Sequence, residues 1–253
     1  MRIHPIAALA AAAVFVSGAV FAQDEQELPE FAPVETFTCN YKEGMDSGDV
    51  DAAVDAWNEW MDKDGGNTYW AATVTPFYYG SETFDIGWIG AWTDGASMGS
   101  GTDKWLSEGG EYAAKFAAAL DCESHSGFAS SKIKESPDED EVDSFVLTFT
   151  DCNIAESDEE IDLFGAFKAW SAYATERGYK NSAWVLFPAY GGGDAEFDFK
   201  IVNAYDNHAE VGHDWDLYAA GDYRKHTELT AAAYECDEAR MYNATIRRRI
   251  DSE

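Results

Sequence analysis

Two segments of the chain carry apolar residues at the spacing of an amphipathic helix. In the first segment these residues are Val50, Ala53, Val54, Trp57 and Met61, and in the second they are Leu163, Ala166, Phe167, Trp170 and Ala174. Both series follow the steps i, i+3, i+4, i+7 and i+11, which place the side chains on one face of a helix. The pattern therefore predicts two helices with the same buried face, although most of their residues differ.

Each of these helices belongs to its own series of predicted strands, and the two series have the same order of elements. Short runs of β-branched and aromatic residues predict strands at 37–42, 69–79, 84–93 and 127–133, and again at 145–153, 183–190, 196–206 and 240–247. A second helix, within residues 109–121 and 219–235, precedes the last strand of each series. The predicted order is strand, helix, strand, strand, helix, strand, and it occurs twice.

The two series also share residues in register. Cys39 is followed by Asn40 as Cys152 is followed by Asn153, 113 positions later, and a tryptophan lies 18 positions after each cysteine. A second cysteine follows the first after 83 positions in one series and 84 in the other. This agreement favours a diverged tandem duplication.

The order βαββαβ is that of a ferredoxin-like unit, a four-stranded antiparallel sheet with both helices on one face. Two such repeats in one chain are expected to cover each other's open faces by packing sheet to sheet. The chain thereby resembles the dimeric α+β barrel superfamily in a tandem, single-chain form, over most of residues 37–250. The resemblance implies an α+β fold and a monomer with an internal pseudo-dimer.

The resemblance implies no single activity, because that superfamily includes cofactor-free monooxygenases, haem enzymes and small-molecule isomerases. No catalytic motif of a member family is recognised in this sequence, so no catalytic residue is assigned. Whether the protein is an enzyme stays open on the sequence.

The first residues predict export. One positive charge at Arg2 precedes an Ala-rich apolar run at 6–21, and small residues end at Ala22 before the chain turns acidic. The run is shorter than the ~20 apolar residues that span a bilayer. We therefore expect a signal peptide at 1–22 and a secreted or periplasmic protein. The expected division beyond it is an acidic segment at 23–36, one repeat at 37–134, an acidic linker at 135–143 and the second repeat at 144–250.

The net charge of the chain limits the classes of binding partner that we expect. The chain has 17 basic and 48 acidic residues, a net charge of −31. Nucleic-acid binding and docking on anionic membranes both depend on basic side chains, so neither partner is expected, nor is membrane insertion. Such acidity serves solubility, and a saline habitat is one further explanation that composition leaves open.

The four cysteines are expected to form structural disulfides. In a ferredoxin-like unit the end of the first strand lies beside the start of the fourth, which implies the pairs Cys39–Cys122 and Cys152–Cys236. A metal or redox site would usually need closer spacing, such as C-x-x-C, and the sequence contains none.

No cofactor or metal ion is predicted. His208, His213 and Asp214 or Asp216 have ligand chemistry that suits zinc, but their spacing matches no metal motif. A haem ligand at His226 or His213 would rest on analogy of fold alone. The basic run 247–249 is expected to pair with carboxylates.

Aromatic residues supply the remaining candidate site. Alternate positions on the predicted third strands place bulky side chains on one face, including Trp88, Trp92, Phe199, Asn203 and Tyr205. In one interpretation this face is the helix-packed core. In the other it lines a cavity between the two sheets that binds a small apolar or aromatic ligand. The functional prediction is such a binding protein, and the alternative is a cofactor-free oxygenase or isomerase using the same cavity.

Overall fold

A computed structural model describes residues 29–64, 68–81, 84–137, 141–157, 160–193 and 195–250. The predicted signal peptide and part of the predicted acidic linker lie outside these residues. In the part of the chain that the model describes, no helix is both long and apolar enough to cross a membrane.

In its described residues, the first half of the chain contains four strands and three main helices. In chain order they are β1 (Ala32–Tyr41), α1 (Ser47–Met61), β2 (Tyr69–Tyr78), β3 (Ile86–Trp92), α2 (Gly95–Glu108), α3 (Gly110–Ala119) and β4 (Leu120–Lys134), with a short 3-10 turn, Asp62–Asp64, after α1. The first strand begins at Ala32 rather than at residue 37, so part of the expected acidic segment is strand.

The second half repeats this order with one interruption. Its elements are β5 (Ser144–Ile154), α4 (Leu163–Arg177), β6 (Ser182–Tyr190), β7 (Phe199–Tyr205), α5 (His208–Leu217), the π-helical turn η2 (Tyr218–Asp222), α6 (Tyr223–Thr230), β8 (Tyr234–Cys236) and β9 (Arg240–Arg248). The last strand is thus divided into β8 and β9, whereas β4 is continuous.

Two helices were missed by the sequence analysis. The sequence analysis assigns no element directly after β3 or β7, but α2 and α5 start there, each capped by a polar residue. The Asp94 side chain accepts a hydrogen bond from the Ser97 amide at 2.7 Å, and the Asn207 side chain accepts from the amides of Ala209 and Glu210. These helices expose most of their surface, so they lack the apolar stripe by which a helix is usually found.

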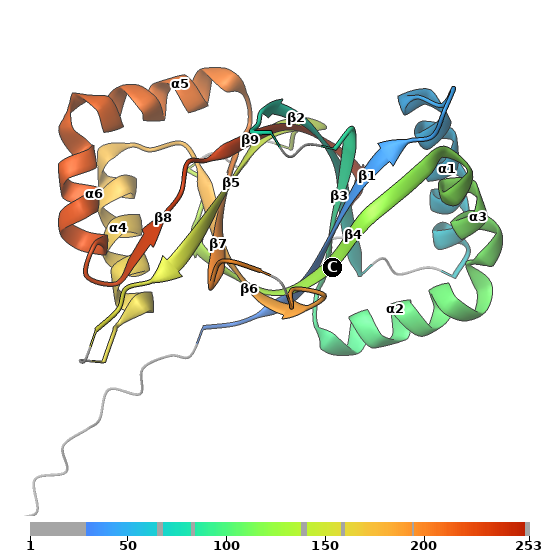
Figure 1. Ribbon diagram of the computed structural model, residues 1–253, viewed down its shortest axis with the longest axis horizontal. Helices are drawn as coiled ribbons and strands as arrows, with labels where there is room; N and C mark the ends of the chain where they lie inside the picture. Colours follow the sequence, from blue (N-terminus) through green and yellow to red (C-terminus); the bar gives the residue numbers. More distant parts are fainter. Residues whose placement is uncertain are drawn as a thin grey trace, which may run out of the picture.

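Eight strands close into an antiparallel barrel, seen end-on in Figure 1. The strand order is β4-β1-β3-β2 in the first half and β9-β5-β7-β6 in the second. Hydrogen bonds between β2 and β9, and between β4 and β6, join the halves at both edges. The expected packing of two separate sheets is therefore corrected, because the strands form one continuous surface with an inside and an outside.

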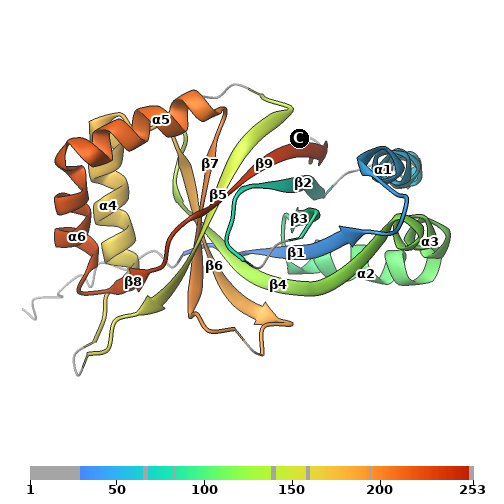
Figure 2. The ribbon, with the colours of Figure 1, turned by 45° about the horizontal axis from the view of Figure 1, so that its top comes forward.

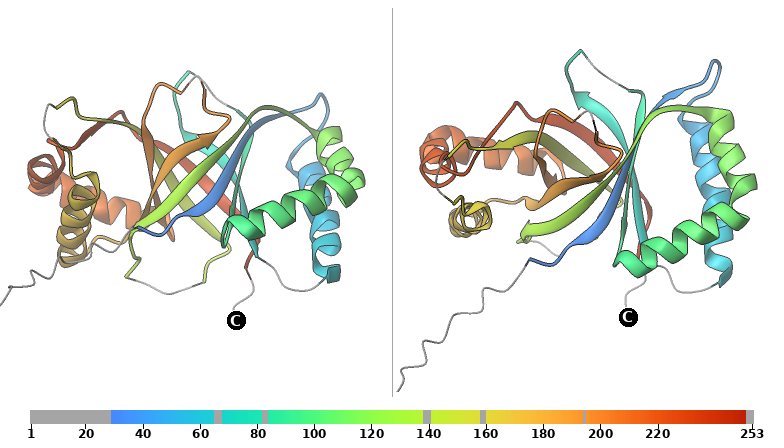
Figure 3. Two further views of the ribbon diagram at one scale, coloured as in Figure 1. Left: turned by 90° about the horizontal axis from the view of Figure 1, so that it is seen from below. Right: turned by 60° about the horizontal axis from the view of Figure 1, so that its bottom comes forward.

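Helices cover the barrel on two opposite sides, α1 to α3 on one and α4 to α6 on the other (Figures 1 and 2). The views in Figure 3 show the barrel strands between these two helical layers. Three apolar clusters follow from this arrangement: one inside the barrel, one beneath α1 and α3, and one beneath α4. Each strand therefore buries both of its faces at least in part.

One disulfide links two strands within each half. Cys39 is bonded to Cys122, and Cys152 to Cys236, which is the pairing that the sequence predicts. Each bond joins residues that face each other in neighbouring strands. Because both loops span more than 80 residues, each bond removes much conformational freedom from the unfolded chain.

The three consecutive arginines near the C-terminus pair with carboxylates, as predicted. Arg247 lies 2.9 Å from Asp51, Arg248 lies 2.8 Å from Asp62, and Arg249 lies 2.9 Å from Asp143. The first two pairs connect the end of β9 to α1 and to the turn after it. They attach the last strand to the helical layer of the first half.

Candidate functional site

Aromatic side chains fill one end of the barrel. The rings of Phe84 and Tyr242 are stacked at 5.7 Å, and Phe149 meets Tyr242 edge-on at 5.5 Å. Phe197 packs against the same interior cluster. Large rings packed in this way exclude water, so this end of the interior is closed.

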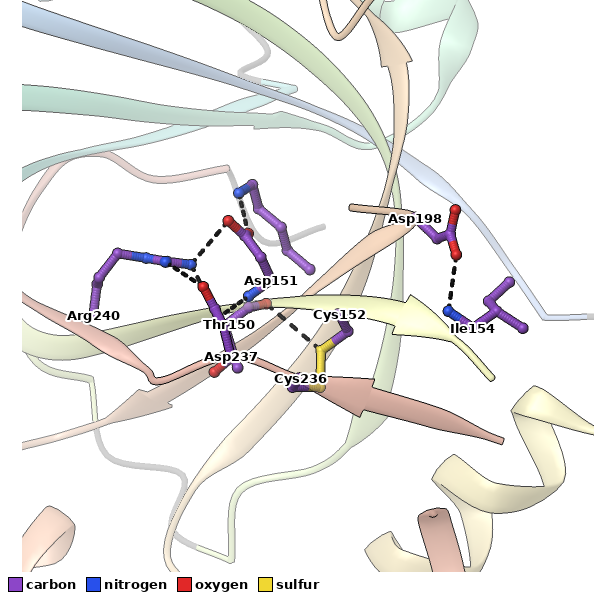
Figure 4. The surroundings of a disulfide bond; sticks show 9 residues. Thr150, Asp151, Cys152, Ile154, Asp198, Cys236, Asp237 and Arg240 are labelled. Carbon is purple, nitrogen blue, oxygen red and sulfur yellow. Dashed lines mark hydrogen bonds and ion pairs between the residues drawn. A yellow bond between two sulfur atoms is a disulfide. The ribbon is translucent and has the colours of Figure 1, made fainter. Parts of the chain in front are cut away.

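Charged side chains lie beside these rings. Asp151 is paired with Lys200 and, at 3.0 Å, with Arg240, which also binds Asp237 at 2.7 Å. Figure 4 shows Asp151, Asp237 and Arg240 next to the Cys152–Cys236 bond. Burial lowers the pKa of Lys200, and the hydrogen bond that its ammonium donates to Asp151 opposes this shift. The ammonium of Lys200 also lies 3.8 Å from the centre of the Phe197 ring, so charge and aromatic packing close this end together.

The opposite end of the barrel is open. A cavity of about 1030 Å³ starts inside the barrel and continues outward past Phe31 to α4. Interior side chains from five strands form its deep part, namely Val34, Ile89, Leu147, Leu186 and Val202, with Ala91 and Ala204 nearer the opening. Trp70, Phe145 and Trp184 surround the mouth.

The space exists because small residues occupy the mouth. On β3 and β7 the last interior positions are Ala91 and Ala204, whereas the corresponding positions at the closed end face large rings. Trp70 and Phe145 have ring centres 6.2 Å apart, which makes one wall aromatic. The cavity can therefore accept a flat apolar molecule against these rings.

Two polar side chains of β4 point into this cavity. Ser130 and Lys132 share the interior face with the buried Phe128, since side chains alternate along a strand. Ser130 is only 6% exposed. The ammonium of Lys132 lies 5.5 Å from the centre of the Trp184 ring and pairs with Glu135. A hydroxyl and a cation thus lie at the edge of an apolar cavity.

The predicted ligand residues of the first half lie elsewhere. Trp88 and Trp92 belong to the cluster beneath α1 and α3, where Trp88 meets Trp57 edge-on at 5.4 Å. They face the helices and not the barrel interior. These two residues therefore do not line the barrel cavity, and the second interpretation of the sequence, a helix-packed core, describes their placement.

The same correction applies to the second half. Phe199 is fully buried and packs against Phe167 of α4, with ring centres 5.6 Å apart. Asn203 accepts a hydrogen bond from the Asn181 side chain at 2.8 Å and donates one to the Thr148 hydroxyl at 3.3 Å. Tyr205 borders a second, smaller cavity of about 310 Å³ next to the barrel mouth, and burial raises its pKa. Asn203 thus has structural partners and is not aimed into the barrel.

The sequence analysis left open which face lines the cavity, and its candidate ligand residues followed from the bulk of the side chains. In a closed barrel a cavity forms where side chains are small, and the interior face of β3 carries Gly87, Ile89 and Ala91. The interior pattern of Trp70 on β2 and Trp184 on β6 is the sequence signal that identifies the mouth. This signal can be interpreted only once the strand pairing between the two halves is known, because that pairing decides which face is interior.

A hydrogen-bonded network explains the glycine between the two tryptophans. The Tyr69 hydroxyl donates to Glu35 at 2.6 Å and accepts from the Trp88 indole at 2.8 Å, while a His125 ring nitrogen lies 2.8 Å from Glu35. Burial and the charge of Glu35 raise the pKa of Tyr69 well above its usual value. A Cβ atom at Gly90 would lie 1.8 Å from the Tyr69 hydroxyl oxygen. Only glycine leaves room for this hydroxyl.

The candidate metal and haem ligands have other partners. His208 lies 2.8 Å from the Asn243 side chain, and His213 lies 3.0 Å from Asp214. Asp214 is 4% exposed and accepts a hydrogen bond from the backbone amide of Lys180 at 2.9 Å, so it fixes the backbone just before β6. His226 packs edge-on against Trp170, and burial lowers its pKa. Among the described residues, no three His, Cys, Asp or Glu side chains gather as a metal site would require.

Comparison with known proteins establishes the fold. No family model matches the sequence, and no curated protein matches it. A solved structure of a candidate monooxygenase from Lactobacillus acidophilus superposes with a TM-score of 0.55 at 9% identity, covering 87% of this chain and 95% of that one. A candidate monooxygenase from Fusobacterium nucleatum gives 0.52 at 9% identity, covering 86% and 93%. The chain therefore shares the α+β barrel fold of these structures, and identities this low carry no activity across.

We expect the substitution Gly90→Ala to destabilise the protein by about 1–3 kcal/mol, because the added methyl group displaces the Tyr69 hydroxyl. In the double variant Gly90→Ala/Tyr69→Phe the loss should be smaller than the sum of the two single losses, since both changes disrupt the same hydroxyl group and its hydrogen bonds. Urea unfolding of the four proteins measures this coupling. Strictly additive losses would contradict the close approach of Gly90 and Tyr69.

Proposed function

We propose that the protein binds a small apolar or aromatic molecule inside the open end of its barrel. The observation that carries the proposal is the cavity of about 1030 Å³, whose deep part is lined by aliphatic side chains and whose mouth is lined by three aromatic ones. Cavities of several hundred Å³ to about 1,000 Å³ that are mostly apolar with few polar groups are typical of small-molecule sites.

Because side chains fill the far end of the barrel, we expect the cavity to have a single entrance, at the mouth. The stacked rings and the ion pairs of Asp151 occupy the far end of the interior. A ligand would therefore enter between Trp70 and Trp184 and leave by the same way. Burial of apolar surface from both the ligand and these rings would drive binding, at roughly 25 cal/mol per Å².

The neutral fluorescent probe N-phenyl-1-naphthylamine tests this function. We expect saturable binding with enhanced probe fluorescence, and at least about a tenfold loss of affinity in Ala204→Trp, because the new ring fills the mouth. Ala209→Trp is the matched control, since Ala209 is exposed on α5 and is not among the cavity-lining residues. Ala91→Trp blocks the mouth from β3 and serves as a second variant should Ala204→Trp unfold.

Binding that survives both mouth variants, each shown to be folded by its thermal unfolding, would refute the barrel cavity as the site. Absence of saturable binding by the parent protein would refute the proposed function itself.

A second candidate function is the oxygenation or isomerisation of a small molecule in the same cavity. Its only support is that the structures with the same fold include proteins described as candidate monooxygenases. Oxygen uptake with a bound phenol such as 1-naphthol, lost in Ala204→Trp, would favour this candidate. Binding without oxygen uptake would favour the binding protein.

We also propose that the two halves are diverged copies of one ferredoxin-like unit. The matching strand orders and the two equivalent disulfides support this origin. A fragment of residues 29–137 keeps one unit but leaves β2 and β4 without their partners β9 and β6. It should dimerise through these edges, as light scattering after gel filtration would show, and a monomeric, soluble fragment would count against the proposal.

Export from the cytoplasm, expected from residues 1–22, stays a prediction. Two disulfides are consistent with an oxidising compartment. The intact mass of protein recovered outside the cytoplasm should lack this segment, and a retained segment would contradict cleavage near Ala22.

A further inference from the structure

We propose that the ligand of the barrel is an amphipathic acid, whose apolar body lies inside the barrel and whose anionic group binds Ser130 and Lys132 at the mouth. This inference rests on the proposed function and adds the chemical class of the ligand. Three features of the described residues support it: the charge around the cavity, the position of Lys132, and the weakness of the ion pair that holds it.

The lining of the cavity is far less acidic than the chain as a whole. Acidic residues outnumber basic ones by 48 to 17 in the whole sequence. The charged residues that line the cavity are two lysines, Lys132 and Lys168, and one acid, Glu30. Even with Glu135, the partner of Lys132, the two lysines balance the two acids here, and local cations are what a site for an anion needs.

The Lys132 ammonium lies where it can contact a ligand inside the barrel. It faces Trp184 across the pairing of β4 with β6, and its ammonium lies 5.5 Å from the centre of that ring. The ring keeps the cation at the mouth, beside the aromatic wall that would receive the apolar part of a ligand. Ser130, one alternate position deeper on the same strand face, is 6% exposed and lines the cavity.

The spacing of these two groups suits a carboxylate. Side chains at alternate positions of a strand start about 6.6–6.8 Å apart, and the flexible stem of lysine shortens the gap between ammonium and hydroxyl. One carboxylate oxygen can accept the Ser130 hydroxyl proton while the other accepts from the Lys132 ammonium. Hydrogen bonds with a charged partner are the stronger kind.

The present partner of Lys132 is easily replaced. Glu135 lies three residues further along the chain, and its side chain is 78% exposed. Exposed ion pairs of this kind contribute little to stability, so a ligand carboxylate can take the place of Glu135 at little cost. At the closed end the situation differs, because Lys200 and its partner Asp151 are 20% and 26% exposed and stay bound to each other.

Two probes of nearly equal shape separate the classes of ligand. We expect 2-naphthoate, which is an anion at pH 7.5, to bind at least about tenfold more tightly than neutral 2-naphthylmethanol in isothermal titration calorimetry. In Lys132→Met the affinity for 2-naphthoate should fall about tenfold while that for the alcohol is unchanged. Lys132→Arg keeps the charge and should retain most of the preference.

Lys225→Met is the matched control. Lys225 also forms an ion pair with a largely exposed glutamate three residues along, Glu228, but on α6 and away from the cavity lining. The substitution Lys225→Met removes the same charge from the protein and should leave the affinities for both probes unchanged.

The possible outcomes keep the two proposals apart. Equal affinity for the two probes, with no effect of Lys132→Met, would overturn the acidic ligand and leave the binding function standing. An equal loss of affinity for both probes in Lys132→Met would mean that the side chain only shapes the mouth, which also overturns the inference. Failure of both probes to bind, together with failure of the neutral fluorescent probe, would overturn both proposals.

Discussion

The pairing of strand edges between the two halves is the interaction on which the rest of the structure depends. Hydrogen bonds from β2 to β9 and from β4 to β6 satisfy the edges that each half would otherwise expose. Closure also gives every strand an inner and an outer face. The inner faces of both halves meet in one apolar cluster, and the outer faces receive the helices. No residue of either half could line the cavity as it does without the other half.

The two ends of the barrel interior differ because their side chains differ in size and charge. Stacked rings and the ion pairs of Asp151 fill one end. Alanines at the other end leave a space between Trp70 and Trp184, with Lys132 at its edge. Both disulfides lie near the closed end, and the barrel strands β1, β4 and β5 that they join or secure contribute to the mouth at their opposite ends. The protein thus combines a cross-linked, packed end with an open one, an arrangement suited to holding a ligand in a rigid frame.

Much of this architecture was predictable from the sequence. The repeated helical stripes, the strand order and the cysteine spacing predicted a barrel of two similar halves and the pairing Cys39–Cys122 and Cys152–Cys236. The cavity was not predictable in the same way. Strand alternation shows that Trp88 and Ile89 point to opposite faces, but only the closed barrel shows which face meets the helices. The helices α2 and α5 were missed because they lie on the surface and lack a continuous apolar stripe.

The central claim is that a ligand binds inside the open end of the barrel, and the position of a bound probe tests it most directly. In a crystal structure of the protein with 2-naphthoate, the account predicts the naphthyl ring between Trp70 and Trp184 and the carboxylate within hydrogen-bonding distance of Lys132. A naphthyl ring bound instead between the sheet and α1, beside Trp88 and Trp92, with an empty barrel mouth, would contradict the account.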